Sequence, residues 1–377
     1  MKDAVQALHV YRTYFPDPQG GLQEAIRQIA LATQAQCIDS TIFTLSPRPE
    51  PAHLERPEGT VVRCRSLLAP ASCDLGGLDA LRTFRQAERM ADVVVHHFPW
   101  PYGDILHAVG GGTPAVMVYH SDIVRQRLLG WIYKPLMWRT MRSMSAIVAT
   151  SASYALTSTV LSHPSIRRKV RVIPLGIVEE SYSQQGDAGV LSRLGLETGE
   201  PYFLFVGVLR YYKGLHALIR AATEVGAKII VAGTGPEGVR LCTLAADCGA
   251  GNVLFTGRIT DEEKVTLLRN CRAAILPSHL RSEAFGMFLV EGAMFARPLI
   301  SCEIGTGTSY VNAHGETGLV VPPDDATALA SAMNVLLRDE ALADRFGRGA
   351  RSRYEQLFSG PVLGRAYAEL FKELAAD

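Results

Sequence analysis

Short apolar runs alternate with amphipathic segments along the whole chain, and this alternation is the feature that most constrains its fold. In the first half the pattern predicts strands at Gln6–Tyr11, Ser40–Leu45, Asp92–His96, Ala115–His120, Ala146–Thr150 and Lys169–Ile173. In the second half it predicts strands at Tyr202–Gly207, Lys228–Ala232, Asn252–Phe255, Ala273–Leu276, Pro298–Ser301 and Leu319–Val321. Segments with helical spacing, such as Leu22–Ala35 and Asp261–Asn270, fill the gaps. We therefore expect an α/β fold built on parallel sheets.

The length of 377 residues exceeds what one ordinary hydrophobic core covers, so two domains are expected. The boundary is predicted after Val172–Gly176, because the polar segment Glu179–Glu200 follows it. We predict two doubly wound, Rossmann-like domains, residues 1–176 and 177–361, with a last helix at 362–377 that packs back on the first domain. Such domains would face each other across a cleft at the carboxyl ends of their strands.

Composition excludes several classes of protein. With 47% hydrophobic and 20% charged residues the chain is neither disordered nor fibrous. No apolar run is long enough to span a membrane, and the N-terminus lacks the pattern of a signal peptide. Seven scattered cysteines indicate reduced thiols in a cytoplasmic protein. No Asp-x-Asp pair occurs, so neither a metal ion nor another cofactor is expected.

The charge is unevenly distributed. Residues 1–178 hold 19 basic and 13 acidic residues, whereas residues 179–377 hold 19 and 24. Between Ile123 and Val178 there are nine basic residues and no acidic one. The segment Arg125–Arg142 mixes five cations with aromatic and aliphatic residues, and Leu81–Arg89 adds Arg82, Arg85, Arg89 and Phe84. This composition favours contact with an anionic membrane; nucleic acid and a core helix with exposed cations are the alternatives.

The stretch 277–291, PSHLRSEAFGMFLVE, follows an apolar strand and carries Glu283 and Glu291 eight residues apart. Phe285 and Gly286 lie between them, where a helix is expected to begin. Backbone N–H groups at a helix start can bind phosphate, and carboxylates accept hydrogen bonds from sugar hydroxyls. The stretch therefore fits a nucleotide sugar.

Five other strand ends carry candidate site residues. Arg210 and Lys213 enter a helix after the first strand of the second half, as diphosphate ligands or as a solvated pair. Gly20 and Gly21 form a βα turn that could approach a ligand, and His120 could bind a substrate hydroxyl or be structural. Gly233 and Gly235 belong to a GxGxxG pattern, but no carboxylate ends the next strand, which favours a tight turn over dinucleotide binding. The loop Ser301–Tyr310 could line the site or be a mobile surface loop.

Together these residues resemble the retaining glycosyltransferases of family 4, which have the GT-B fold. The resemblance covers nearly the whole chain, and the Glu-x7-Glu pair Glu283/Glu291 is its most specific part. One departure stands out, because many members have Arg directly after the glycine of this strand, where the present chain has Val208. The segments VLRYYKG and GTGTSYVN are most similar to those of bacterial O-antigen and capsule enzymes that use GDP-mannose or GDP-rhamnose.

The resemblance implies roles for these residues. The first domain would bind the acceptor and the second the donor. Arg210 and Lys213 would bind the donor diphosphate, and Gly20 and Gly21 would lie by the phosphates and the acceptor. Glu283 would contact the hydroxyls of the donor sugar, and the N–H groups of Phe285 and Gly286 would contact the phosphates. Glu291 would bind the ribose. Arg258 and Ile259 would border the base. His120 would contact the transferred sugar, and Gly233 and Gly235 would shape the site.

The expected function is transfer of a hexose, mannose or rhamnose, from a GDP-sugar to a lipid-linked saccharide in cell-surface polysaccharide synthesis. The expected partners are the donor, that acceptor and the anionic inner face of the cytoplasmic membrane, with no nucleic acid. Two alternatives stay open. One is a non-catalytic nucleotide-sugar-binding subunit of a glycan-assembly complex, and the other is an epimerase or phosphorylase with the GT-B fold.

Overall fold

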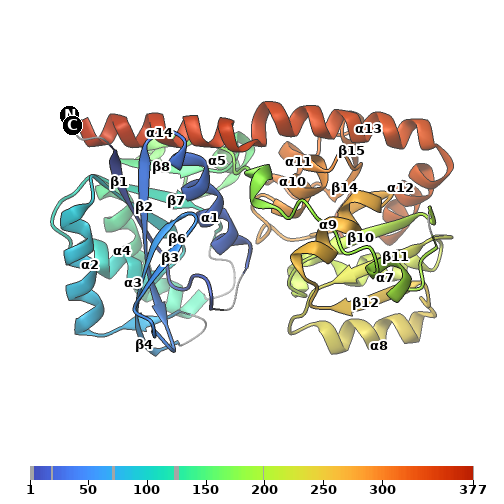
Figure 1. The fold of residues 1–377 in the computed structure, drawn as a ribbon, viewed down its shortest axis with the longest axis horizontal. Coiled ribbons are helices and arrows are strands. Elements are labelled where there is room, and N and C mark those ends of the chain that lie inside the picture. The colour runs from blue at the N-terminus through green and yellow to red at the C-terminus, as the bar shows by residue number, and fades with distance from the viewer. Residues whose placement is uncertain (1–3, 18–19, 70–72, 123–126, 198, 377) are drawn as a thin grey trace. The chain divides into compact units, whose positions relative to one another are not determined.

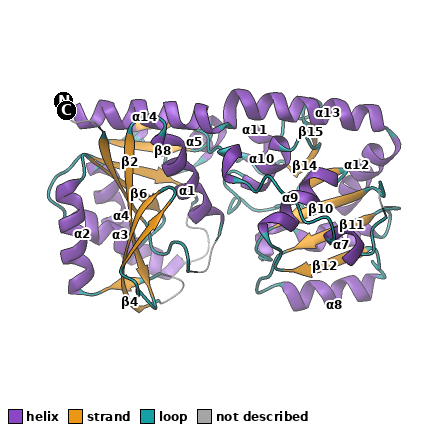
Figure 2. Cartoon of the chain, in the orientation of Figure 1, coloured by secondary structure: helices purple, strands orange, loops and turns teal. Residues whose placement is uncertain are grey.

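The computed structural model describes residues 4–17, 20–69, 73–122, 127–197 and 199–376, with the backbone alone for 127–132. The chain forms two compact units (Figure 1). The first comprises Met1–Gly176 together with Gly360–Asp377, and the second comprises Ile177–Ser359. Each unit has helices packed around a sheet of its own (Figure 2). Among the described residues, no helix has the length and apolarity needed to cross a membrane.

The described part of the first unit contains one sheet of nine strands. They are β1 (Val5–Val10), β2 (Ile38–Ser46), β3 (His53–Arg56), β4 (Gly59–Leu68), β5 (Leu75–Gly76), β6 (Val93–Phe98), β7 (Ala115–Tyr119), β8 (Ala146–Ala149) and β9 (Val170–Val172). Their order is β3-β4-β2-β1-β6-β7-β8-β9, with β5 paired to β4. Pairs from β4 through β9 are parallel. Strand β6 is buried at every position, as expected for a central parallel strand covered on both faces.

The antiparallel edge of this sheet was not among the strands predicted from the sequence. Strands β3 and β4 pair antiparallel, and β5 pairs antiparallel with β4. Polar residues and prolines interrupt the apolar pattern there, and β3 alternates between exposed and half-buried positions. An edge strand with one wet face carries little hydrophobic signal, so the pattern of buried strands passes over it.

The helices of the first unit are α1 (Gly21–Gln34), α2 (Leu78–Met90), α3 (Pro101–Ala108), α4 (Arg127–Ser143), α5 (Ala152–Thr157) and α14 (Gly360–Ala376). The last of these closes the chain and packs against α1 and β1 (Figure 1). The fit against α1 is close, because a Cβ at Gly364 would stand 2.1 Å from the carbonyl oxygen of Ala32. The C-terminal helix is thus part of the core of the first unit, and it begins at Gly360, two residues before the expected start.

The described part of the second unit has a sheet of six strands, all parallel. They are β10 (Tyr202–Val206), β11 (Lys228–Ala232), β12 (Val253–Gly257), β13 (Ala273–Leu276), β14 (Leu299–Cys302) and β15 (Gly318–Val321). The helices are α6 (Val190–Arg193), α7 (Leu215–Ala222), α8 (Gly238–Cys248), α9 (Asp261–Asn270), α10 (Met287–Met294), α11 (Thr308–Val311), α12 (Ala326–Arg338) and α13 (Glu340–Arg353). A π-helical turn, Tyr354–Phe358, follows α13.

The order of this second sheet is β12-β11-β10-β13-β14-β15. The chain winds outward from β10 in one direction and then returns to β13 and winds in the other. The neighbours β10 and β13 therefore form the topological switch point of the sheet, where their following loops diverge and leave room for a ligand. The loops after these two strands are the ones that carry Arg210, Lys213 and Glu283.

Candidate functional site

The loops after β10 and β13 are tied together by an ion pair. The Nζ of Lys213 contacts Oε2 of Glu283, and Ser278 Oγ donates to the same oxygen at 3.3 Å. Only 13% of the Lys213 side chain and 12% of the Glu283 side chain are exposed. Burial is the largest influence and lowers the pKa of Lys213, but Glu283, Tyr212 and Glu291 together outweigh it, so this pKa lies above its usual value. The ammonium group is therefore held charged inside a largely dry site.

Close backbone packing fixes the turn that carries Lys213. The turn Tyr211–Lys213 is a 3₁₀ helix that ends at Gly214, whose φ of 69° lies in the left-handed region. A Cβ at Gly214 would stand 1.9 Å from the Pro277 carbonyl oxygen, so only glycine fits. The backbone N–H of His279 donates to the Tyr212 carbonyl at 3.0 Å. These contacts join the β10 loop to the β13 loop and set the position of the Lys213 side chain.

Glu291 lies on α10 and has partners of its own. The Tyr182 hydroxyl donates to its Oε1, and Lys264 Nζ contacts the same oxygen at 3.1 Å. Lys264 also stands 4.6 Å from the centre of the Tyr182 ring. Glu291 is among the charges that raise the pKa of Lys213, so both carboxylates act on the same ammonium group. The structure thus brings Glu283, Glu291 and Lys213 into one electrostatic neighbourhood.

Backbone groups beside Glu283 are also held in place. Phe285 is buried against Phe358, and Gly286 has a φ of 92° immediately before α10. Among the described residues, the backbone N–H groups of Phe285 and Gly286 donate to no acceptor. The Thr306 hydroxyl donates to the Glu283 carbonyl at 2.8 Å. Because Thr306 and Thr308 are buried, the Ser301–Tyr310 segment is a packed support for this loop and not a mobile surface loop.

The remaining predicted residues of the second unit border this arrangement or stand in solvent. The turn that contains Gly233 and Gly235 packs on the β10 loop, because Cβ atoms there would lie 2.0 Å from Gly207 O and 2.4 Å from Leu209 O. The side chains of Arg210 and Arg258 are exposed, and Ile259 is half-buried. Arg258 and Ile259 follow β12, and Arg210 directly precedes the Lys213 turn.

In the first unit, Gly20 and Gly21 form the start of α1, with Gly20 as an extended N-cap residue. A Cβ at Gly21 would meet no described atom within 4 Å. His120 directly follows β7 and is 9% exposed. Burial lowers the pKa of His120 to about 3, so its ring is neutral at physiological pH.

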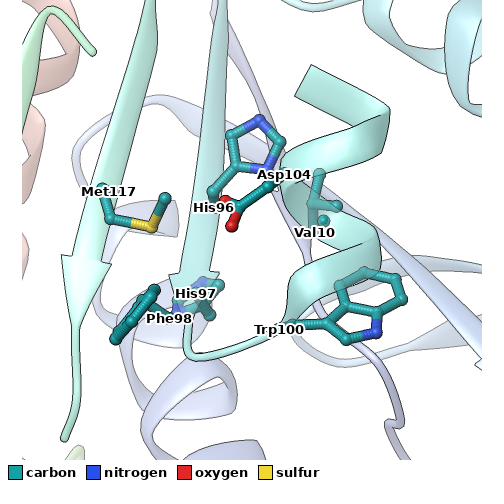
Figure 3. A pocket seen from close by; sticks show the side chains of 8 residues that line it. Val10, His96, His97, Phe98, Trp100, Asp104 and Met117 are labelled. Carbon is teal, nitrogen blue, oxygen red and sulfur yellow. The ribbon is translucent and has the colours of Figure 1, made fainter. Parts of the chain in front are cut away.

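His120 is the last of three buried histidines in contact. His97 Nδ1 lies 2.9 Å from His120 Nε2, and His9 Nδ1 lies 3.1 Å from His97 Nε2. Both pairs of rings stack with an interplanar angle of 24°. The adjacent His96 is also buried, and it lines a small pocket together with His97, Asp104 of α3 and Met117 of β7 (Figure 3). Among the described atoms, neither ring nitrogen of His96 has a hydrogen-bond partner.

Sequence reasoning missed several of these residues. Tyr182 and Lys264 are the partners of Glu291, and His9 and His97 stand behind His120. Lys264 had a signal, because Thr260 and Glu263 form a capping box that starts α9 and places Lys264 on its first turn. The histidine row had no signal, since its members are far apart in the chain.

Comparison with known proteins agrees with this architecture. Residues 20–176 match the family model described as glycosyl transferase 4-like domain, and residues 191–353 match the model described as glycosyl transferases group 1. The chain is 44% identical over 356 residues to D-rhamnosyltransferase WbpZ of Pseudomonas aeruginosa, covering 94% of this chain and 92% of the relative. It is 40% identical over 371 residues to O-antigen chain mannosyltransferase C of Escherichia coli, covering 98% and 99%.

The chain belongs to the group 1 glycosyltransferases. Among solved structures, sucrose-phosphate synthase of Thermosynechococcus elongatus aligns with a TM-score of 0.81 at 21% identity, covering 99% of each chain. At that identity the likeness concerns the fold alone. This glycosyltransferase therefore has the GT-B fold, and the family and fold expected from the sequence are both confirmed.

Proposed function

We propose that this glycosyltransferase is a retaining enzyme that moves mannose or rhamnose from a GDP-sugar to a lipid-linked saccharide in O-antigen synthesis. The names of the two relatives support the sugar and the pathway. The second unit binds the donor, and the first unit binds the acceptor. No metal ion and no cofactor is part of the proposal, because the charge of the diphosphate is assigned to Lys213 and Arg210.

The observation that carries the donor assignment is the Lys213–Glu283 pair at the switch point of the second sheet. A buried ammonium group next to the start of α10 places positive charge and backbone N–H groups on the same side of the sheet. The Glu283 carboxylate beside it can accept hydrogen bonds from two sugar hydroxyls. Glu291, held by Tyr182 and Lys264, is assigned to the nucleotide ribose.

The chemistry needs stabilisation of separating charge. The bond between the sugar C1 and the diphosphate oxygen breaks, and a bond from C1 to an acceptor hydroxyl oxygen forms on the same face. The proton of that hydroxyl passes to the departing phosphate oxygen, so no protein nucleophile is required. Positive charge on Lys213 and Arg210, together with the N–H groups of Phe285 and Gly286, stabilises the diphosphate as it leaves. His120 contacts the sugar that is transferred.

Turnover of radiolabelled GDP-mannose and GDP-rhamnose with a lipid-linked saccharide acceptor tests the proposed reaction. The expected product is a longer lipid-linked glycan whose new linkage has the anomeric configuration of the donor. Transfer with inversion would contradict the retaining assignment, and donor binding without transfer to any acceptor would favour a non-catalytic subunit. Sugar rearrangement without acceptor would favour an epimerase.

Thermal unfolding with GDP, UDP, ADP and their sugars tests the donor separately. A ligand at about 100 times its Kd stabilises the native state by about 2.7 kcal/mol, which raises the Tm. We expect GDP and GDP-sugars to give the largest rise. A larger rise with UDP or ADP would overturn the choice of nucleotide.

The proposed membrane contact uses basic side chains of α2 and α4. Arg82, Arg85 and Arg89 are exposed on α2, as are Lys134, Arg139 and Arg142 on α4. The aromatic part of the expected surface is different, because Phe84 is fully buried and the Tyr133 hydroxyl donates to Asp104. Residues 125 and 126 of the basic segment 125–142, and the side chains of residues 127–132, lie outside the described part of the chain. The contact is therefore assigned to electrostatic attraction, which salt screens.

Vesicle sedimentation tests this contact. We expect binding to vesicles with anionic lipid, loss of binding at high salt, and little binding to neutral vesicles. The variant Arg82→Gln/Arg85→Gln/Arg89→Gln should bind more weakly than the parent. Equal binding to neutral and anionic vesicles, or binding to neither, would remove the membrane from the proposal.

A further inference from the structure

Three neighbouring strands place His9, His97 and His120 in one row. Strand β6 lies between β1 and β7, and each of the three carries or immediately precedes one member of the row. Side chains alternate along β6, so His97 points to one face of the sheet while His96 points to the other, where it meets His107 of α3. Phe371 of α14 stands edge-on to His9, with ring centres 6.3 Å apart.

The rings of this row are neutral. All three are buried, with exposures of 0% for His9, 2% for His97 and 9% for His120. Burial lowers the pKa of His9 to about 4, lowers that of His120 to about 3, and holds that of His97 well below its usual value. A neutral imidazole has one N–H and one nitrogen lone pair, so each ring can donate at one nitrogen and accept at the other.

Two contacts between three neutral rings permit only two arrangements of the protons. If His97 carries its proton on Nδ1, it donates to Nε2 of His120 and accepts at its own Nε2 from Nδ1 of His9. His120 then has its proton on Nδ1. If His97 carries its proton on Nε2, both hydrogen bonds reverse, and His120 has its proton on Nε2 and a lone pair on Nδ1.

The far end of the row distinguishes the two arrangements. Nε2 of His9 is buried and has no hydrogen-bond partner among the described atoms. The second arrangement leaves an unpaired N–H there, whereas the first leaves an unpaired lone pair. Unpaired buried N–H groups are the rarer of the two in folded proteins, because a desolvated donor is costly. The buried end of the row therefore favours the arrangement in which the outer ring is protonated on Nδ1.

We propose that His9 and His97 are positioning residues that hold His120 in the Nδ1-protonated tautomer, so that His120 donates a hydrogen bond to a sugar oxygen and does not act as a base. This inference rests on the proposed transfer reaction for the role of His120, but the tautomer is a property of the first unit alone. Stacking of the rings at 24° also restricts rotation of the His120 ring. The N–H group that donates to the sugar oxygen is thereby in place before the substrate arrives, which lowers the free-energy cost of reorganisation in the reaction.

Nuclear magnetic resonance of the full chain with ¹⁵N-labelled histidine reads the tautomer directly. The His120 signals are assigned by their loss in His120→Gln. At neutral pH we expect His120 to show a protonated Nδ1 and an unprotonated Nε2. A protonated Nε2, or a ring with both nitrogens protonated, would overturn the proposal.

Substitutions at His97 test the role in transfer. In His97→Asn the amide N–H can take the place of Nδ1–H and still donate to His120, whereas His97→Phe removes the donor. We expect His97→Phe to lower kcat about tenfold with little change in donor KM, and His97→Asn to restore most of the loss. Equal losses in the two variants would mean a structural role only.

His96→Phe is the matched control, because it changes a buried histidine on the same strand whose ring contacts the other face of the sheet. It should keep both the His120 tautomer and kcat. A loss of kcat equal to that of His97→Phe would overturn the assignment. Absence of transfer in the parent enzyme would instead contradict the proposed function, while the resonance measurement would still decide the tautomer.

Discussion

The second unit holds its candidate site groups as paired charges, whereas the first holds His120 in a row of neutral rings. Lys213 keeps its charge in spite of burial because Glu283 touches it, and Glu291 has Tyr182 and Lys264. The three histidines contact one another through ring nitrogens, and burial keeps them uncharged. The difference follows the chemistry proposed for each unit, since a departing diphosphate needs fixed positive charge, whereas a neutral N–H is enough to donate to a sugar oxygen.

The sharpest way to break this comparison is to remove the charged pair. We expect Lys213→Ala or Glu283→Ala to lower turnover about 10²- to 10³-fold, because charge on the leaving diphosphate then lacks its stabilising partner or its positioning group. The measurement is kcat with saturating donor, together with circular dichroism to show that each variant is folded.

The matched control is Lys228→Ala, which breaks the ion pair between Lys228 and Glu200, 2.9 Å apart on another part of the same unit. Its turnover should equal that of the parent. Full activity in folded Lys213→Ala would remove Lys213 from the mechanism.

Acid should weaken the unit with the neutral histidines. Since folding lowers the pKa of His96 to about 3, the unfolded chain takes up a proton near pH 6.5 and the folded chain does not. The free energy of unfolding therefore falls as pH drops below 6.5, by about 1.4 kcal/mol per pH unit for each such group. Asp104 has the opposite effect on the free energy of unfolding, because burial raises its pKa to about 7. The test therefore compares a histidine variant with the parent protein.

We expect His96→Phe to reduce the pH slope of stability between pH 6 and pH 4 by about one proton, measured by urea unfolding. His53→Phe, which removes an exposed histidine of β3, should keep the slope of the parent. Equal slopes in His96→Phe and the parent would show that His96 takes up its proton equally in both states.

The close packing of Gly214 against Pro277, which holds the turn of Lys213, gives a smaller expected effect, on stability. Gly214→Ala should lower the free energy of unfolding by about 3 kcal/mol, because a left-handed φ and a clash with the Pro277 carbonyl act together. Gly249→Ala is the control, with a φ of 70° and no described atom within 4 Å of the added Cβ. It should cost about 1 kcal/mol from backbone strain alone. Equal losses would mean that the two loops separate easily.

The smallest expected effect concerns Glu291. Tyr182→Phe removes a hydrogen bond to its carboxylate and should raise donor KM about threefold to tenfold, with kcat nearly unchanged. Tyr202→Phe removes another buried tyrosine hydrogen bond of this unit, 2.8 Å long and made to the Leu267 carbonyl. It should lower stability by about 1 kcal/mol and leave KM alone. If both variants raise KM equally, the Tyr182 bond only stabilises the fold.

The sequence predicted the second sheet more fully than the first. All six strands of the second unit were expected, because each is a short apolar run, and β10, β11, β13 and β14 are buried at nearly every position, as in a covered parallel sheet. In the first unit β3, β4 and β5 were missed, because β3 is an edge strand with exposed positions and Arg63 interrupts the short apolar run of β4. A strand can be predicted from local pattern where burial restricts its residues to apolar types, and it is missed where exposed positions admit polar residues.

The same limit applies to the site. Lys213 and Glu283 could be found because they follow strands at recognisable turns, and Glu291 because it stands eight residues after Glu283. Tyr182 lies in a polar connecting segment, and its contact with Glu291 spans 109 positions. His9 is a single polar residue in β1 and His97 follows His96 near the end of β6, and only the sheet order brings His9 and His97 to His120. Contacts that depend on topology cannot be derived from local pattern.

The helix α14 has a consequence for biosynthesis. Translation completes the second unit, Ile177–Ser359, before residues 360–376 exist, yet those last residues pack on α1 and β1 and set Phe371 beside His9. The half of the chain that leaves the ribosome first is thus the half that matures last. A premature stop codon before position 360 would leave the second unit whole, but the first unit would lack the helix that covers α1 and β1.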